Sequence, residues 1–273
     1  MIRWLTETET LHGPLGKLGT IRALDCWQGR ESVLQAKELV ATVATQSYGK
    51  DGASNPEALF DKLVSSKPMH GEPLEIVPFP TTWTRTRDLE EVEGNLWTSG
   101  KLRQAPIRLG SLRHNLEALD DPKRWGQRVA DIGRQGQPAF AFKLSIPLYT
   151  YVHLLRHGGT FGKNVTSRRW VTGSKMPFEF YGADSDLDES PISDFHAACI
   201  REYERRLDAG WKPERARGCI PQEVLVPFWY WGYARDFLGG FQEQRCNQPK
   251  VQEETAIVST WIRDFCLSME TKA

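Results

Sequence analysis

The sequence predicts an α+β protein in which helices and strands form one large domain with an inserted segment. The first observation is a set of helices with clear start signals, such as the Asn-Pro-Glu run at 55–57. The second is a run rich in β-branched and aromatic residues, V-L-V-P-F-W-Y-W at 224–231, which is typical of a strand. The third is the stretch 80–138, which is rich in Arg, Glu, Gly and Pro and is interpreted as an insertion. We expect residues 1–79 and 139–273 to form the main domain and 80–138 an inserted subdomain.

The first half of the main domain should hold strands followed by two helices. Residues 1–30 have no clean hydrophobic period and are predicted to be strand and loop. Residues 31–45 place apolar side chains at helical spacing, so we expect a helix that ends near Ser47. The next helix should begin at Pro56, because an asparagine cap precedes it and an acidic residue follows in the first turn.

The second half should alternate helices with one strand. Pro147 suits the start of a helix, and the Gly158-Gly159 pair should stop it. An amphipathic helix is expected over 192–210 with a glycine stop, and Pro213 should begin a short one. Pro227 should place the 224–231 strand at a sheet edge or kink it. A final helix over 251–269 should bury Val258, Trp261, Ile262 and Phe265, so this segment serves packing.

Composition excludes several classes of function. The 35 basic and 35 acidic residues cancel, so no overall field attracts nucleic acid or an anionic membrane, and any anion site must be a local cluster. We find no apolar run of the length that a signal peptide or a membrane span needs, and expect a cytoplasmic protein. The five cysteines have no C-x-x-C spacing, so we expect reduced thiols and no metal; a metal at the acidic turn 184–191 is a weak alternative.

Residues 147–170 are predicted to form a helix that leads a polar face into a glycine-bearing loop. His153, Arg156 and His157 are three and four residues apart, so they share one face of the predicted helix. The loop that follows is rich in hydrogen-bond donors, among them Lys163 and Arg169. Such a density of donors is typical of a loop that binds a polyanion, and a phosphate is the natural ligand.

This stretch resembles the signature of the flavin-dependent thymidylate synthases, R-H-R-x-x-S-x-N-x-x-S-x-R-Y. Arg156 and His157 open the signature, and Gly158 stands where its third arginine belongs. One extra loop residue brings four more positions into register, namely Asn164, Ser167, Arg169 and Trp170. Without that extra residue Arg168 would take the place of Arg169. We prefer the register that keeps all four positions together.

The resemblance extends over about residues 32–79 and 139–268. F-A-F-K-L-S-I-P-L at 140–148 is similar to the strand and proline before the signature, and the stretch 203–221 is similar to the family's Y-x-x-L-x-x-G and E-x-A-R-x-x-L-P. Residues 233–253 are similar to N-x-R-x-L-x-x-F-x-x-x-R followed by A-Q-x-E. At 69–79, which resembles G-H-x-x-P-F-E-H, Ile76 replaces the closing histidine and Glu75 is kept.

The resemblance implies a fold and a reaction. The fold would be that of the flavin-dependent thymidylate synthases, with a mixed or antiparallel sheet and helices. The reaction would be the C5 methylation of dUMP to dTMP, with FAD as cofactor and with methylenetetrahydrofolate and NADPH as co-substrates. The protein's tasks would then be binding, orientation and electrostatics, without an activated cysteine or a Ser-His-Asp arrangement. Relatives form homotetramers whose active sites draw on several chains, so the same assembly is expected here.

The resemblance also assigns roles to individual residues. Arg156 and Arg245 would form the catalytic centre, where they border the flavin and the pyrimidine, so that Arg156 also binds cofactor and Arg245 also binds substrate. The nucleotide would be held by His153, which replaces a glutamine of relatives, and by Ser167, Arg169 and Arg217. The flavin would be contacted by Ser47, His157, Asn164 and Arg235. The plain alternatives are surface ion pairs for the arginines and, for Ser47, a bond to its own helix.

Other functions stay open from the sequence. A relative that methylates UMP, or that hydroxymethylates a pyrimidine nucleotide, would have a similar sequence. A second alternative is a binding or assembly protein that lost catalysis when Gly158 and Ile76 replaced the arginine and the histidine of the family. The 80–138 segment is interpreted as a solvated excursion with two helices, or else as a lid or interface element.

Overall fold

The computed structural model describes residues 2–65, 72–81, 91–98, 101–112, 129–130, 138–156, 162–167, 171–173, 175–183, 191–246 and 248–270. Several residues singled out above lie outside these ranges: His157, Gly158, Arg168, Arg169, Trp170 and the acidic turn 184–190. Their predicted roles therefore stay predictions.

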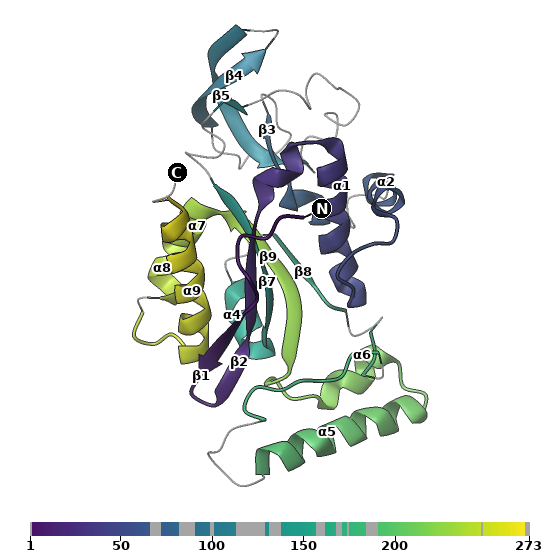
Figure 1. Cartoon of the computed structure of the whole chain (residues 1–273). Helices are drawn as coiled ribbons and strands as arrows, with labels where there is room; N and C mark the ends of the chain where they lie inside the picture. The colour runs from purple at the N-terminus through teal and green to yellow at the C-terminus, as the bar shows by residue number, and fades with distance from the viewer. Residues whose placement is uncertain are drawn as a thin grey trace.

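A five-stranded antiparallel sheet forms the centre of the molecule, in the order β1-β2-β7-β9-β8 (Figure 1). Its strands are β1 (Glu9–Gly13), β2 (Gly16–Asp25), β7 (Ala139–Pro147), β8 (Gly162–Val165) and β9 (Leu225–Tyr233). All four pairings are antiparallel. This confirms the α+β class with an antiparallel sheet, and it confirms strands within residues 1–30.

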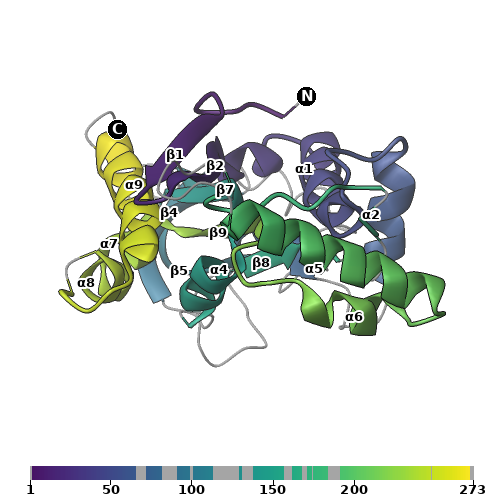
Figure 2. The same cartoon turned by 90° about the horizontal axis from the view of Figure 1, so that it is seen from below.

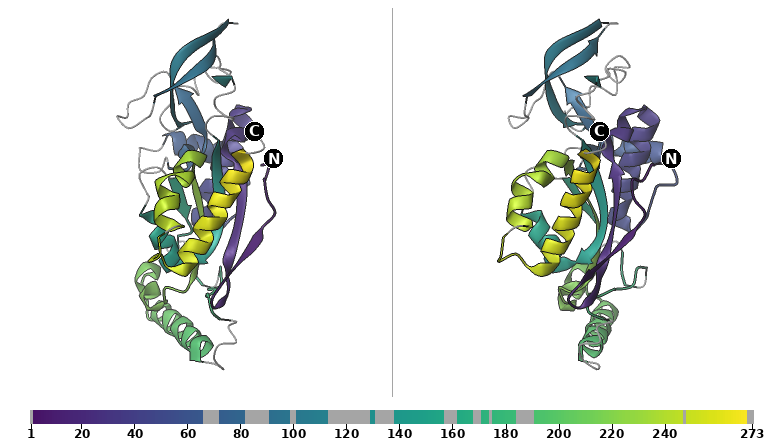
Figure 3. Two further views of the ribbon diagram at one scale, coloured as in Figure 1. Left: turned by 90° about the vertical axis from the view of Figure 1, so that its left-hand side faces the viewer. Right: turned by 60° about the vertical axis from the view of Figure 1, so that its left-hand side comes forward.

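Each face of the sheet carries a hydrophobic core, because side chains alternate along the central strands. In β7, Phe140, Phe142 and Leu144 belong to the first core, whereas Ala139 and Ala141 belong to the second. The first core is covered by α4 (Leu148–Leu155), α7 (Ala234–Leu238), α8 (Gly240–Arg245) and α9 (Glu253–Glu270). The second is covered by α1 (Val33–Thr45), α2 (Pro56–Ser65), η1 (Cys26–Arg30) and η4 (Glu72–Ile76). Figure 3 shows these two groups of helices on opposite sides of the sheet.

The helix signals in the sequence correspond to helix ends in the structure. The Asn55 side chain accepts a hydrogen bond of 3.0 Å from the Ala58 N–H, which confirms the predicted cap of α2. The amphipathic helix is α5 (Pro191–Asp208), and Gly210 follows it at φ +78°, a left-handed conformation that favours glycine. The short helix α6 (Pro213–Ala216) begins at its proline, and η7 (Arg217–Cys219) follows. Figure 2 shows α5 and α6 together, seen from below the sheet.

Helix α4 ends earlier than the stop predicted at Gly158-Gly159. Pro147 is its extended cap residue, and the helix ends at Leu155 with Arg156 as the C-terminal cap. The side chains of His153 and Arg156 still lie three residues apart on one helical stretch, as the sequence indicated.

The prediction of an edge position for the Pro227 strand was wrong. Strand β9 lies inside the sheet, between β7 and β8. The Pro227 carbonyl accepts a hydrogen bond of 3.0 Å from the Thr166 N–H, so this residue faces the side of β8, just beyond the last β8 pair, Val165 with Phe228. Proline has no N–H to return a bond to Thr166, so this position keeps a single hydrogen bond and the β8 pairing ends at Val165.

Strand β8 lies at the edge of the sheet and depends on a glycine. A Cβ atom at Gly162 would lie 2.0 Å from Cε2 of Trp231, which Gly162 faces on β9. Any side chain at Gly162 would push β8 away from β9, so glycine is required here for close approach.

A second, four-stranded sheet lies within residues 78–130, in the order β3-β5-β4-β6. Its strands are β3 (Pro78–Thr81), β4 (Glu91–Thr98), β5 (Lys101–Ser111) and β6 (Val129–Ala130). The described parts of the predicted insertion are thus strands rather than helices. The short apolar run S-L-R-H-N-L-E-A-L at 111–119 lies mostly outside the described residues. Leu112, directly after β5, donates its N–H to the Val77 carbonyl at 2.8 Å and is buried in the second core.

Candidate functional site

The end of α1 is joined to the end of β8 by a row of hydrogen bonds, which we call the η2–β8 seam. The seam consists of the short helix η2 (Gln46–Tyr48) and the segment 164–167. Ser47 Oγ donates to Asn164 Oδ1 at 2.8 Å, and Asn164 Nδ2 donates to the Val43 carbonyl at 2.5 Å. The Ser167 N–H donates to the Ser47 carbonyl at 3.1 Å. Three predicted site residues from distant parts of the chain, Ser47, Asn164 and Ser167, are therefore neighbours.

The seam leaves part of its polar capacity for a ligand. An asparagine side chain has two N–H donors and two acceptor lone pairs, and Asn164 uses one of each within the protein. Ser47 Oγ donates to Asn164 rather than to its own helix, so the plain interpretation of this serine was wrong. Its lone pairs can still accept a hydrogen bond. The seam is thus able to donate one N–H and to accept at Ser47.

A second group of predicted residues lies on the opposite face of the sheet. His153 and Arg156 come from the end of α4, and Arg245 comes from the end of α8. Burial lowers the pKa of the His153 imidazole, and the nearby charges of Arg156 and Arg245 lower it further. Thr255 Oγ1, in the first turn of α9, lies 3.5 Å from His153 Nδ1. The neutral form of the His153 imidazole is therefore favoured by burial and by these two nearby cations.

The surroundings of Arg245 disfavour the positive charge of its guanidinium. Burial lowers the pKa of its guanidinium, and the charge of Arg156 lowers it further, opposed by Tyr230. Its Nε is buried and has no hydrogen-bond partner among the described residues. No ion pair joins Arg156 or Arg245 to an acidic side chain in the described part of the chain. An anionic or carbonyl-bearing ligand would supply the missing acceptor.

The remaining predicted residues come from other elements of the chain. Arg217 is exposed on η7, next to α5 and α6. Arg235 begins α7 beyond the end of β9, where its Nε lies 3.7 Å from Asp236 Oδ1 and its guanidinium lies over the Tyr233 ring. His157 and Arg169 lie outside the described residues.

Sequence reasoning missed several residues that line these two groups. Gln46 is buried, and its Nε2 donates to Thr166 Oγ1 at 2.6 Å within the seam. Tyr230 is buried beside Arg245, and its hydroxyl donates to the Leu154 carbonyl at 3.4 Å. The sequence placed Tyr230 in a predicted strand, but no sequence signal predicted a partner on α4, because that contact spans distant segments.

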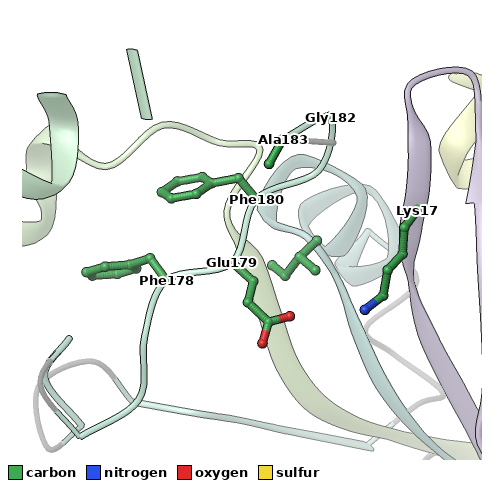
Figure 4. Close-up of a pocket in the computed structure, with 7 residues that line it drawn as sticks. Lys17, Phe178, Glu179, Phe180, Gly182 and Ala183 are labelled. Carbon is green, nitrogen blue, oxygen red and sulfur yellow. The ribbon is translucent and has the colours of Figure 1, made fainter. Parts of the chain in front are cut away.

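A cavity of about 320 Å³ lies away from both groups. It is lined by Lys17, Phe178, Glu179, Phe180, Gly182, Ala183 and Leu225. In Figure 4 the Phe178 and Phe180 rings point away from Lys17, which reaches across from the β2 side. None of the predicted site residues lines this cavity, so it is not the site that the sequence indicates.

Comparison with known proteins identifies the second half of the chain. Residues 136–266 match the sequence profile of the family described as thymidylate synthase complementing protein, Thy1. Over these residues, just under half of its length, the chain is similar to this family, as a divergent relative would be. The Thy1 match covers β7 to α9 and therefore includes every predicted site residue except Ser47, while the resemblance of 32–79 lies outside it.

Solved structures give a weaker likeness. One is a UMP/dUMP methylase, PolB from Streptomyces cacaoi, bound with 5-Br UMP; it is 21% identical, with a TM-score of 0.40, over 48% of this chain and 70% of that one. The same methylase bound with 5-Br dUMP is 20% identical, with a TM-score of 0.38 over the same shares. No curated protein matches the chain. The described residues include no helix that is long and apolar enough to cross a membrane, and no cluster of ligands for a metal ion.

Proposed function

We propose that the chain is an FAD-dependent enzyme that methylates C5 of dUMP to give dTMP. Methylenetetrahydrofolate would be the carbon donor and NADPH the reductant. The observation that carries the proposal is the cluster of His153, Arg156 and Arg245, with its unpartnered buried Nε. The relationship to the Thy1 family supports a transfer of one carbon to a uracil nucleotide. UMP as substrate, or a hydroxymethyl product, is the alternative.

The cluster has the chemistry that binding a uracil nucleotide needs. Two adjacent guanidinium groups can bind a phosphate or a ring carbonyl through paired N–H donors. A neutral His153 can donate one hydrogen bond and accept another, as the glutamine of relatives does. Tyr230, which belongs to the first core, lies beside the half-buried Arg245, whereas Arg156 is exposed and open to a ligand from solvent. These residues would orient the pyrimidine ring and stabilise negative charge that develops on it.

The seam on the other face fits part of a flavin. Asn164 has one free N–H and Ser47 has free lone pairs, which suit the polar edge of a dinucleotide. FAD, when bound, would supply the hydride that reduces the transferred carbon to a methyl group. His157 and Arg235 complete the proposed flavin contacts. Ile76, which replaces a histidine of relatives, is only 1% exposed in the second core, so it offers a ligand nothing.

The two groups flank the edge strand β8 from opposite faces of the sheet. The seam lies on the α1 face, whereas His153, Arg156 and Arg245 lie on the α4 face. This arrangement supports a homotetramer in which residues of a neighbouring copy complete each site. We propose that assembly for this chain. Light scattering on the purified protein tests it, and a stable monomer with full activity would contradict it.

The visible absorption spectrum of the purified protein tests the proposed function. We expect a flavin spectrum, release of FAD on heating, and a change in the spectrum when dUMP is added. Titration with UMP distinguishes the alternative substrate, and analysis of the product distinguishes methyl from hydroxymethyl. A colourless protein that also fails to take up added FAD would contradict the proposal and favour the binding or assembly alternative.

A further inference from the structure

Gln46 is a buried polar residue in a place where an apolar residue would cost less. It lies in η2 and is only 3% exposed. Its amide Nε2 donates to Thr166 Oγ1 at 2.6 Å, but its Oε1 is buried without a partner among the described residues. Burying an amide that is only half satisfied is unfavourable compared with burying a hydrocarbon. The residue therefore contributes something other than stability.

The pairing register of the segment that Gln46 contacts is only weakly fixed by strand β8 itself. Strand β8 has only four residues, lies at the edge of the sheet and begins with the glycine that allows close approach. A shift of one residue in a strand exchanges its two faces. Here such a shift would turn Val165 toward α1 and remove Asn164 from the seam. Short, glycine-containing edge strands are the ones most prone to such a shift.

The bonds of the seam prevent that shift. Asn164 and Thr166 are two residues apart, so they point to the same face of the strand. They bond to Ser47 and Gln46, which are adjacent in η2. The Thr166 N–H is also bonded to the Pro227 carbonyl, and the Ser167 N–H to the Ser47 carbonyl. One register alone satisfies all of these contacts.

We propose that Gln46, through Thr166, is a positioning residue that fixes the register of the 164–167 segment and so presents Asn164 and Ser167 to the nucleotide and flavin. The ligand contacts of Asn164 and Ser167 in this inference rest on the proposed function. The effect of Gln46 on the strand register does not. The pair acts by excluding the alternative register, and Gln46 need not touch either ligand.

Three variants separate positioning from stability. Gln46→Leu and Thr166→Val each leave one buried polar group without its partner, so each should lower the urea midpoint. The double variant Gln46→Leu/Thr166→Val replaces both partners by apolar groups of similar shape and should restore the midpoint. We expect its Kd for dUMP to remain about tenfold above that of the unchanged protein. Thr166→Ser, which keeps the hydroxyl, should retain the original affinity.

Amide hydrogen exchange measures how firmly the 164–167 segment is held, without any ligand. In the double variant the amide of Ser167 should exchange about tenfold faster, as should the amide at position 166 after correction for its changed side chain, while those of Leu144 and Ile146 in β7 stay unchanged. Ser259→Ala is the matched control, because Ser259 is a buried hydroxyl without a partner in the described ranges, on α9. That control should alter neither exchange at 166–167 nor dUMP binding.

The outcomes distinguish the two proposals. Slow exchange at 166–167 in the double variant, with its affinity for dUMP intact, would overturn the positioning role. If the unchanged protein binds neither dUMP nor UMP, the proposed function fails, and the exchange experiment still decides whether Gln46 fixes the segment. Should the single variants not fold, the double variant and Thr166→Ser suffice for both measurements.

Discussion

At the scale of single residues, Arg245 is held in the folded protein at an electrostatic cost. Its guanidinium is partly desolvated and lies near Arg156, and each effect lowers its pKa. Its Nε has no partner among the described residues. Residues in such a position are retained for a ligand more often than for folding. The cost should therefore be recovered when an anion binds.

The Arg245→Ala variant should lose affinity without losing stability. A charge-assisted hydrogen bond is worth about 1.5–3 kcal/mol, so the Kd for dUMP should rise roughly tenfold to a hundredfold. Arg245→Lys should not restore binding, because an ammonium group lacks the planar fork of donors. The urea midpoint should not fall, since repulsion with Arg156 is removed. Arg205→Ala, an exposed control paired with Glu202, should leave binding unchanged; equal affinity in all three variants would contradict this assignment.

His196 should make stability depend on pH. It is buried on α5 and stacks on the Phe180 ring at 4.1 Å between centroids. Burial lowers the pKa of its imidazole, and Glu223 opposes this only in part. The folded state therefore keeps His196 neutral at a pH where the unfolded chain, with a pKa of about 6.5, already takes up a proton.

The sign of the effect follows from proton binding. Below pH of about 6.5 the unfolded state binds more protons, so the free energy of unfolding should fall as pH falls, by at most about 1.4 kcal/mol per pH unit for this group. His153 should add to the same trend, because its pKa is lowered too. In His196→Gln the slope between pH 5 and about 6.5 should be smaller, as urea denaturation can measure. The exposed His12→Gln variant should keep the slope, and an identical slope in both variants would contradict the argument.

At the scale of elements, the first turn of α9 fixes α4 in place. The Glu254 carboxylate faces the phenols of Tyr149 and Tyr181, and a hydrogen bond to it contributes, after burial, to the raised pKa of each phenol. Tyr181 in turn accepts a hydrogen bond of 2.9 Å from the Leu15 N–H. Because Tyr149 lies on α4, this carboxylate also orients the helix that carries His153 and ends next to Arg156.

Two neighbouring substitutions on α9 should therefore differ. Glu254→Gln replaces one carboxylate oxygen by an NH₂ group that cannot accept, which should cost about 1–3 kcal/mol of unfolding free energy. Glu253→Gln removes the same charge from the same helix turn, but this residue is exposed and should cost about 0.3–1 kcal/mol through the helix dipole alone. Urea denaturation at neutral pH measures both. Equal losses would show that the two phenols do not depend on Glu254.

The sequence predicted most helices of the main domain because their signals are local. The cap at Asn55, the glycine stop after α5 and the proline start of α6 needed no tertiary information, since each acts within one turn of helix. Pro227 misled because its effect depends on where the neighbouring strand ends. The strands of the second sheet were missed because their pattern is interrupted by glycine, proline and charges.

The candidate site was predictable only as far as the family signature reaches. The family resemblance singled out His153, Arg156 and Arg245 from three separate positions, and in the structure the charges of both arginines act on His153. It did not indicate that Asn164 bonds to Ser47, because that contact joins segments more than a hundred residues apart. Gln46 and Thr166 carried no signal at all, since a lone polar residue at a helix end is usually exposed.

At the scale of the whole molecule, the described part of the 80–138 segment joins the main domain near Val77 and Leu112. Strand β3 pairs with β5 from Pro78 with Ser111 to Thr81 with Arg108, and the chain then returns to the second core through Leu112. Leu112 is fully buried there. The part of the segment beyond the Thr81 and Arg108 pair can thus be removed without opening the core, whereas Leu112 cannot. The boundary of the insertion predicted at residue 80 does not separate these two parts.

This difference predicts opposite results for two changes of very different size. Replacing residues 82–107 by Asn-Gly should join β3 to β5 through a two-residue turn and keep the Leu112 contact with Val77, so the free energy of unfolding should change by less than about 1 kcal/mol. Strand β6 loses its partner β4, but it spans only two residues. Leu112→Ala, a single substitution, should cost about 2–5 kcal/mol, because it leaves a cavity in the second core. Urea denaturation followed by tryptophan fluorescence reports on that core through Trp27, Trp229 and Trp231. If the large deletion unfolds the main sheet while Leu112→Ala does not, the second sheet itself supports the main domain and the 80–138 segment is not a separable insertion.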